Sequence, residues 1–460
     1  MATSIFLDFT LPNSTSWFYF SLFLTVSLFF NFHRPFLSRN WDLLALFLFV
    51  PGFLFVQESH VLEAVTPGRL PPASTSVEEP TALKIDREDT IRNRTSFLGY
   101  LWLIAASGYW LIRCLVDLST TKRPLPSVNL AVPALMFFTL SLFVCLAVVA
   151  FQRPGDPWEP SSHRATADSP DPATSQQQSP TSLEPWTAGA KSTHPRQPSV
   201  VKWIALLGHC CILIGLYMMG SWRFQDRQTG AMAAALYLLL PYTAYHISMV
   251  SHVWPAVFVV WALLLYRNPG SAGGLLGLAI ASFIFPVVLV PAWIQFYRGR
   301  SAGRFLLGLA VGIVVGSALM LALACFTPLK PWFWSQEQLA NWQPWQVPQT
   351  ESLWTGTHWA YRLPVFIAYL ALVVTTIFWP PIRDLGNLVA ISAALIIGLQ
   401  FWQGNQGGLY VLWYVPLLIV MVVRPNLTEH HPPMVAIWPR RVVAAADWCR
   451  RRVAGPSLPA

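Results

Sequence analysis

The sequence is poor in charge, cysteine and nucleotide-binding or hydrolytic motifs. Only 11% of its 460 residues are Asp, Glu, Lys or Arg, whereas a soluble domain carries about 25%. The six cysteines form no CxxC pair and no Cys/His cluster with zinc spacing, so a disulfide scaffold and a structural zinc site are excluded. The chain has no P-loop, GxGxxG, HExxH or GxSxG element, which excludes a built-in ATP motor.

Apolar and aromatic residues are abundant instead. They make up 54% of the chain, with 22 Trp and 29 Phe, and the mean hydropathy is +0.46. This composition excludes an ordinary soluble enzyme and a disordered or fibrous protein. The apolar residues come in blocks of roughly 15–25, about the length that crosses a bilayer. We therefore predict an all-α, polytopic integral membrane protein.

The apolar blocks predict about 12–13 transmembrane helices, with Trp and Tyr at many block edges as interfacial anchors. The expected spans are residues 17–32, 41–56, 96–115, 128–151, 201–220, 230–250, 255–266, 274–297, 304–326, 363–379, 388–402 and 409–423.

The net charge of +9 fits cations that are retained on the cytoplasmic side of a membrane, so we expect membrane lipid and no nucleic acid as a partner. Most short connectors between the spans carry Arg or Lys. Placing them in the cytoplasm puts the N-terminus outside and the C-terminus inside, as in a bacterial inner membrane protein. Segments 57–95, 152–199 and 327–362 then lie outside.

Four units follow along the chain. Residues 1–151 form an N-terminal four-span unit, and residues 200–423 form a C-terminal membrane unit. Between them, residues 152–199 are rich in Pro, Ser, Thr and Gln and predict a disordered extracytoplasmic loop. Residues 424–460 form a basic cytoplasmic tail.

One span conflicts with this topology. Arg267 and the pair Arg298 and Arg300 flank residues 274–297, and both ends of a single span cannot be cytoplasmic. Pro286 and Pro291 interrupt its second half, and proline removes a helix hydrogen bond. We therefore expect a broken or re-entrant pair of short helices; the alternative is one tilted span with a tolerated positive outer loop.

The densest polar and aromatic stretch near a span end reads PYTAYHISMVSHVWP, residues 241–255. Candidate substrate-binding residues here are Tyr242, Tyr245, His246 and His252. The two histidines are six residues apart and do not share a helical face, so a divalent metal is not supported and no cofactor is evident. They either donate, accept or transfer protons near the outer interface, or they cap short interfacial helices.

Segment 327–362 holds six Trp and five Gln. This composition suits either a loop that lies on the membrane surface or one that stacks on sugar rings. Its candidate substrate-binding residues are Trp342, Gln343 and Trp345. We expect this segment, the histidine segment and the broken span to border one cavity.

Between Trp222 and Arg304 the chain carries AAALYLLLPYTAY, SMVSHVWP, RNPGSAG, GLLGLAIASFIFPVVLVPAW and YRGR, and it closes with GGLYVLWYVPLLIVMVVRPNL. This pattern resembles the polyprenyl-phosphate-sugar-dependent glycosyltransferases of the GT-C superfamily, especially their bacterial mannosyltransferase-like branch. It covers about half the chain. The N-terminal stretch WLIRCLVDLSTTKRPLPSVNL looks instead like an uncharacterised bacterial membrane-protein family.

This resemblance implies a GT-C-like fold, a lipid-linked sugar donor and an outward-facing site whose base is an outer carboxylate. The candidate catalytic residues are Glu58, Asp156 and Glu159. The chain departs from the family at Ser282, Phe283 and Ile284, where a basic residue is common. The leading hypothesis is a GT-C-like glycosyltransferase or an inactive relative. A carrier or flippase for a lipid or envelope precursor, and a non-catalytic scaffold, are the alternatives.

Overall fold

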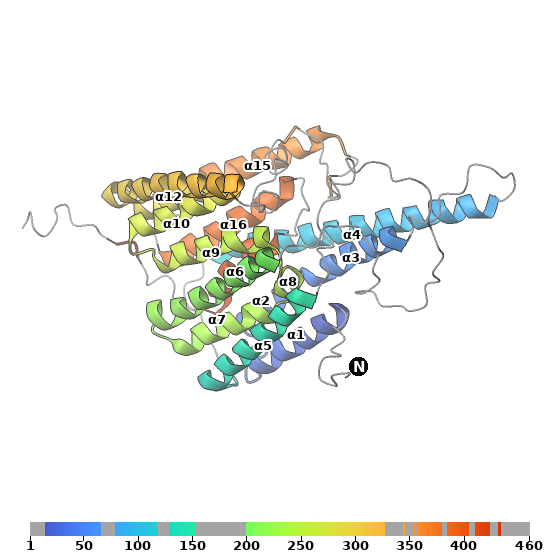
Figure 1. Ribbon diagram of the computed structural model, residues 1–460, viewed down its shortest axis with the longest axis horizontal. Helices are drawn as coiled ribbons and strands as arrows, with labels where there is room; N and C mark the ends of the chain where they lie inside the picture. The colour runs from blue at the N-terminus through green and yellow to red at the C-terminus, as the bar shows by residue number, and fades with distance from the viewer. Residues whose placement is uncertain are drawn as a thin grey trace, which may run out of the picture.

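The apolar blocks fold into helices that lie side by side (Figure 1). A computed structural model describes residues 14–65, 79–117, 128–152, 199–326, 344–345, 353–354, 357–379, 384–403, 410–423 and 431–433, which contain helices and no strand. Six helices are long and apolar enough to cross a membrane, and four shorter apolar helices accompany them. The protein is therefore a helical membrane protein, while the count of about 12–13 spans stays a prediction.

The N-terminal helices are α1 (Ser14–Phe29), α2 (Ser38–Ala45), α3 (Val50–Val65), α4 (Glu79–Asp117) and α5 (Val132–Gln152). Next come α6 (Ser199–Met218), η2 (Met219–Arg223), α7 (Arg227–Leu239), α8 (Pro241–Tyr245), α9 (Val250–Leu264), α10 (Pro269–Ser282), η3 (Phe285–Leu289), α11 (Val290–Tyr297) and α12 (Gly299–Phe326). The last elements are η4 (Trp359–Tyr361), α15 (Arg362–Thr375), α16 (Leu385–Trp402), η5 (Val411–Trp413) and α17 (Val415–Val423).

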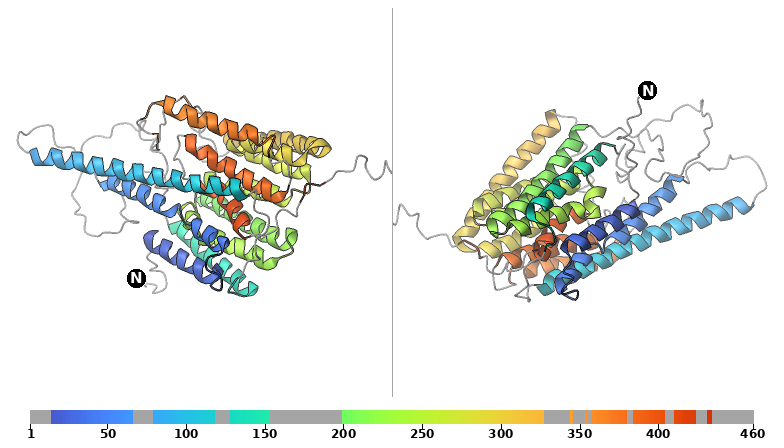
Figure 2. Two further views of the ribbon diagram at one scale, coloured as in Figure 1. Left: turned by 180° about the vertical axis from the view of Figure 1, so that it is seen from behind. Right: turned by 90° about the horizontal axis from the view of Figure 1, so that it is seen from below.

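Helices α3 and α4 form an antiparallel pair that extends further than the sequence predicts. The predicted outer segment 57–95 is helical at both ends, because α3 continues to Val65 and α4 already begins at Glu79. Figure 2 shows α4, of 39 residues, running past the ends of the other helices. The two helices approach closely where Gly99 faces Val56 and Gly52, since glycine has no side chain to separate them.

Helices α6 and α9 run parallel and pack with a seven-residue repeat. Trp254 donates to the carbonyl of Ile204 at 3.2 Å, and Trp261 donates to that of Cys211 at 3.1 Å. Each indole lies against a glycine of α6, Gly208 or Gly215. Packing that repeats every seven residues is the geometry of parallel coiled coils.

The chain breaks and reverses between α10 and α12, as the charges around residues 274–297 predict. Phe283 has extended φ and ψ angles of −147° and 136° and ends α10. The chain then returns through η3 and α11, and the hydroxyl of Tyr297 donates to the carbonyl of Tyr266 at 2.7 Å. Both ends of this broken hairpin therefore lie at the same end of the bundle, and the alternative of one tilted span is wrong.

Helices α10 and α12 run parallel and touch along their backbones. The glycines at 308 and 312 of α12 face the carbonyl oxygens of Gly270 and Gly274 of α10. A Cβ atom at either position would overlap that oxygen. These glycines, spaced by four on α12, therefore let two backbones approach more closely than any side chain permits.

Side-chain donors satisfy the carbonyl groups where helices are interrupted. The predicted span 41–56 is two helices, α2 and α3, separated by a turn at residues 46–49. Around this turn, the carbonyls of Ala45, Leu46 and Leu48 accept hydrogen bonds. The donors are Trp110 at 3.1 Å, Tyr242 at 2.7 Å and Trp102 at 2.7 Å. An unsatisfied carbonyl inside a membrane costs free energy, so these bonds make the break tolerable.

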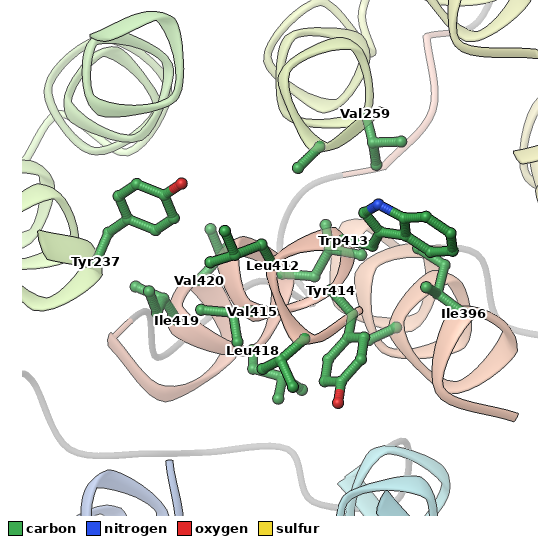
Figure 3. Close-up of a cluster of buried hydrophobic side chains, with 14 of the residues drawn as sticks. Tyr237, Val259, Ile396, Leu412, Trp413, Tyr414, Val415, Leu418, Ile419 and Val420 are labelled. Atoms are coloured by element: carbon green, nitrogen blue, oxygen red, sulfur yellow. The ribbon is translucent and has the colours of Figure 1, made fainter. Parts of the chain in front are cut away.

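Helix α17 lies at the centre of the bundle, and all nine of its residues are buried. Figure 3 shows the adjoining Trp413 lying between Val259 of α9 and Ile396 of α16, whereas Tyr414 points to the other side of the segment. The predicted closing span 409–423 is thus a short 3₁₀ turn and a nine-residue helix, surrounded by protein.

Cations gather at one end of the helices, which we call the basic end. It holds the turns at residues 30–37, 224–226 and 298–299. Contacts of Arg39 with Met232, of Arg223 with the carbonyl of Leu264 and of Tyr297 with the carbonyl of Tyr266 bring these turns to the same end. Twelve Lys and Arg side chains are described. Nine lie at the basic end, and the other three, Arg94, Lys202 and Arg362, do not. The nine are Arg34, Arg39, Arg113, Arg223, Arg227, Arg267, Arg298, Arg300 and Arg304.

Three of the four described carboxylates also lie at the basic end, where one pairs with an arginine and two cap helices. Asp42 makes two bonds to Arg113, at 2.8 and 2.9 Å. Asp226 and Asp384 are the N-caps of α7 and α16, where carboxylates favour the helix dipole. Burial raises the pKa of the Asp384 carboxyl, and its bond from the Asn387 backbone opposes that rise. Among the described acids only Glu58 lies at the opposite end.

Replacing Gly312 by alanine should destabilise the protein, because the new methyl group meets the backbone of α10. Overpacking of this kind costs about 1–3 kcal/mol, which thermal unfolding in detergent followed by circular dichroism would detect. The matched control is Gly303→Ala on the same helix, where an added Cβ meets nothing within 4 Å. Equal midpoints for both variants would contradict the packing described for α10 and α12.

Candidate functional site

The predicted histidine segment reverses the chain inside the bundle. Helix α7 ends at Leu239, and Pro241 begins the short helix α8, where a proline at the first position costs no hydrogen bond. His246 is the C-cap residue of α8. The side chains of His246 and His252 are only 1% and 5% exposed. The histidines therefore lie in the protein interior, and His246 also caps a short helix.

Five aromatic rings from three parts of the chain stack in a continuous column. Its members are His246, His252, Tyr410, Trp413 and Phe285, in that order. The ring centroids are 4.2, 4.8, 4.1 and 3.9 Å apart, and successive planes differ by 6°, 20°, 20° and 10°. This ring column joins the histidine segment to the break in the α10–α11 hairpin. Two of the three predicted features thus meet through direct contact.

Neighbouring rings hold the first member of the column. Phe53 of α3 lies edge-on to His246, with centroids 5.8 Å apart, and stacks on Tyr245 at 5.9 Å. The Nδ1 atom of His246 lies 3.0 Å from the sulfur of Met249. Tyr242 is fully buried and donates to the carbonyl of Leu46, so its role is to join α8 to the turn between α2 and α3.

A third buried histidine, which the sequence analysis missed, lies beside this cluster. His209 of α6 is 0% exposed, and its Nδ1 lies 2.8 Å from the hydroxyl of Tyr237. Its ring is next to the backbone of His246. The signal was a lone histidine in the apolar segment 201–220, and only proximity in the fold connects it to residues 241–255.

The polar atoms that the histidines bring to the cluster are imidazole nitrogens. The Nδ1 atom of His252 is buried and has no hydrogen-bond partner, so it can accept a proton or a hydrogen bond. Because the rings of His246 and His252 are almost parallel, their in-plane lone pairs do not converge on one point. The described residues include no group of three or more His, Cys, Asp or Glu side chains that could hold a metal ion.

The Trp-rich segment reaches the same end of the bundle. The indole of Trp354 donates to the carbonyl of Phe401 at 2.9 Å, and the adjacent Gln400 donates to the carbonyl of Tyr410 at 3.3 Å. This chain of contacts connects Trp354 to the ring column. The predicted residue Trp345 is 60% exposed, while Trp342 and Gln343 lie outside the described residues.

The candidate carboxylates are only partly described. Glu58 is exposed and follows Phe53 on α3 by five residues, which is about 7.5 Å along a helix. It therefore lies beyond the ring that contacts His246, toward the end of the bundle. Asp156 and Glu159 lie outside the described residues. Two buried amide oxygens, of Gln400 and Gln403, have no hydrogen-bond partner in the same region.

Comparisons of the chain with family models, curated proteins and solved structures find no match.

Replacing Trp413 by alanine should destabilise the protein more than replacing an exposed tryptophan by alanine. Its ring is 4% exposed, stacks on two neighbours and donates to the carbonyl of Ser251 at 3.0 Å. Loss of a buried Trp costs about 3–5 kcal/mol, measured as a lower thermal midpoint in detergent. Trp345→Ala is the control and should leave the midpoint unchanged; similar losses in both variants would contradict a central role for the column.

Proposed function

We propose that the protein is a membrane glycosyltransferase of the GT-C type, which transfers a sugar from a polyprenyl-phosphate donor at the end of the bundle opposite the basic end. The observation that supports this proposal is the ring column. It brings buried imidazoles, a tyrosine and a tryptophan together beside a broken hairpin inside an apolar bundle. A lipid-linked sugar needs such a combination, an apolar path for its tail and an aromatic, polar surface for its head.

The charge distribution supports the orientation of this site. Nine of the twelve described cations lie at the basic end, and cytoplasmic loops of membrane proteins are enriched in Lys and Arg. With the basic end in the cytoplasm of a bacterial cell, the N-terminus and the ring column face outward across the inner membrane. The C-terminal tail, whose sequence is basic, then lies inside.

In this proposal Glu58 is the base. The hydroxyl oxygen of the acceptor attacks the anomeric carbon of the sugar, the bond from that carbon to the phosphate oxygen breaks, and polyprenyl phosphate leaves. The carboxylate takes the hydroxyl proton as the new bond forms. Among the described residues Glu58 is the one acid at this end of the bundle, and it is exposed. Asp156 and Glu159 are the other candidates.

A proton-coupled carrier for a lipid or envelope precursor is the second candidate function. The buried cluster of His209, His246 and His252 favours it, because ionisable residues inside a membrane bundle are typical of proton pathways. The sequence alone offers a carrier as an alternative but counts against proton coupling, since the spans are almost free of charge. The two functions differ in whether a covalent product forms.

Glu58→Gln should lower sugar transfer about 10²–10⁴-fold, the usual contribution of a general base. The assay uses purified protein in proteoliposomes with polyprenyl-phosphate mannose as the donor and an envelope extract as the acceptor, and counts labelled product. The thermal midpoint should stay at the wild-type value, because the side chain is exposed. Asp156→Asn and Glu159→Gln are the comparison variants. Full activity in all three, or no transfer by the wild type, would contradict the proposal.

His252→Phe separates the two functions. A phenyl ring keeps the stack and removes the unpartnered buried nitrogen, so the variant should fold with an unchanged or higher midpoint. A carrier that moves protons through His252 would lose pH-driven uptake of a fluorescent lipid in proteoliposomes. A transferase with Glu58 as its base would keep measurable product formation in the same variant.

A further inference from the structure

Arg39 is a buried cation without an anionic partner. It is the second residue of α2 and is 3% exposed. Its Nη2 atom contacts the sulfur of Met232 at 3.3 Å, and its Nε and Nη1 atoms have no hydrogen-bond partner. A thioether is a weak acceptor, and a guanidinium cannot lose its proton in a protein. Burying such a charge without a partner costs free energy, and a bound anion would offset that cost.

The carboxylate on the same helix as Arg39 is already engaged. Asp42, three residues along the same helix, accepts a hydrogen bond from Arg113 at each of its two carboxylate oxygens. Arg34, in the preceding turn, is exposed. Together these four groups, three guanidinium groups and one carboxylate, carry a net charge of +2. The local field at the start of α2 therefore attracts an anion.

Hydrogen bonds of the Asn40 side chain hold the turn before α2 in place. The side-chain amide of Asn40 donates to the carbonyls of Asn31, Arg34 and Pro35, at 3.1, 3.1 and 3.2 Å. Its oxygen accepts from the backbone of Asn31 at 3.1 Å. The buried side chain of Asn40, the residue after Arg39, thus joins the turn to the start of α2.

Exposed aromatic rings around this turn indicate where the anion comes from. Phe32, Phe36 and Trp41 are 62%, 85% and 57% exposed. Aromatic side chains at the level of the lipid headgroups anchor membrane proteins. Their presence on both sides of Arg34 and Arg39 puts the turn at the height of lipid phosphates, and Arg binds phosphate through two parallel hydrogen bonds.

We propose that Arg39 belongs to a binding site for the phosphate of an anionic lipid at the basic end. The Nε and Nη1 atoms of Arg39 face the ligand, and Phe32, Phe36 and Trp41 hold the turn in the headgroup layer. This site is separate from the ring column and does not depend on the function proposed for it.

The test compares thermal unfolding of the full chain in nanodiscs of pure phosphatidylcholine with nanodiscs that contain phosphatidylglycerol. We expect the anionic lipid to raise the wild-type midpoint by about 5 °C. Arg39→Met should abolish that shift. In pure phosphatidylcholine its midpoint should be equal to or above that of the wild type, because an unpaired buried charge has been removed. A third sample, phosphatidylcholine with added inorganic phosphate, shows whether free phosphate fills the site instead.

Arg34→Met is the matched control, since it removes an exposed cation from the same turn and should keep most of the shift. Arg39→Lys keeps the charge but loses the planar fork, so a smaller shift is expected. This variant decides the matter if Arg39→Met does not fold. An undiminished lipid response in Arg39→Met or, failing that, in Arg39→Lys would overturn the proposal, as would equal losses in the Arg34 and Arg39 variants. A response to inorganic phosphate alone would overturn the lipid as the source.

Discussion

The fold depends on side-chain hydrogen bonds to backbone carbonyls at the points where helices stop inside the bundle. A bilayer offers no water to these carbonyls, so each interruption needs a donor from the protein itself. Around the turn between α2 and α3, two indoles and a phenol supply the donors. Trp413 does the same for Ser251 at the start of α9, and Tyr297 for Tyr266 at the mouth of the broken hairpin. The abundance of Trp thus has a structural cause beyond interfacial anchoring.

These interruptions also create the candidate site. The ring column passes through a C-cap, a helix start, a 3₁₀ turn and the segment after a helix break, and each is a place where the backbone leaves the regular helix. Irregular backbone lets ring planes from three distant parts of the chain lie parallel and in contact. The ring column is therefore interior, whereas the candidate carboxylate Glu58 is exposed at the same end of the bundle.

Several features of the fold could be predicted from the sequence because they depend on local chemistry. The reversal between Arg267 and Arg298 follows from cations at both ends of a segment with two prolines in its second half. The close approach of α12 to another helix follows from glycines spaced by four. By contrast, the division of the predicted span 41–56 at residues 46–49 was not predicted, although Pro51, the second residue of α3, is a helix-start signal. The donors that satisfy this turn, Tyr242, Trp102 and Trp110, come from elsewhere in the sequence.

The sequence by itself determined that the chain is helical and belongs in a membrane, because apolar block length and charge scarcity are set by composition. It also determined that cations cluster in short connectors. Only the tertiary structure decided which polar groups meet. His209 lies beside His246, Arg113 pairs with Asp42, and His252 stacks on Tyr410, in each case across a contact between separate segments. Such pairings depend on which helices are neighbours and on how they are rotated, and local sequence carries little information about either.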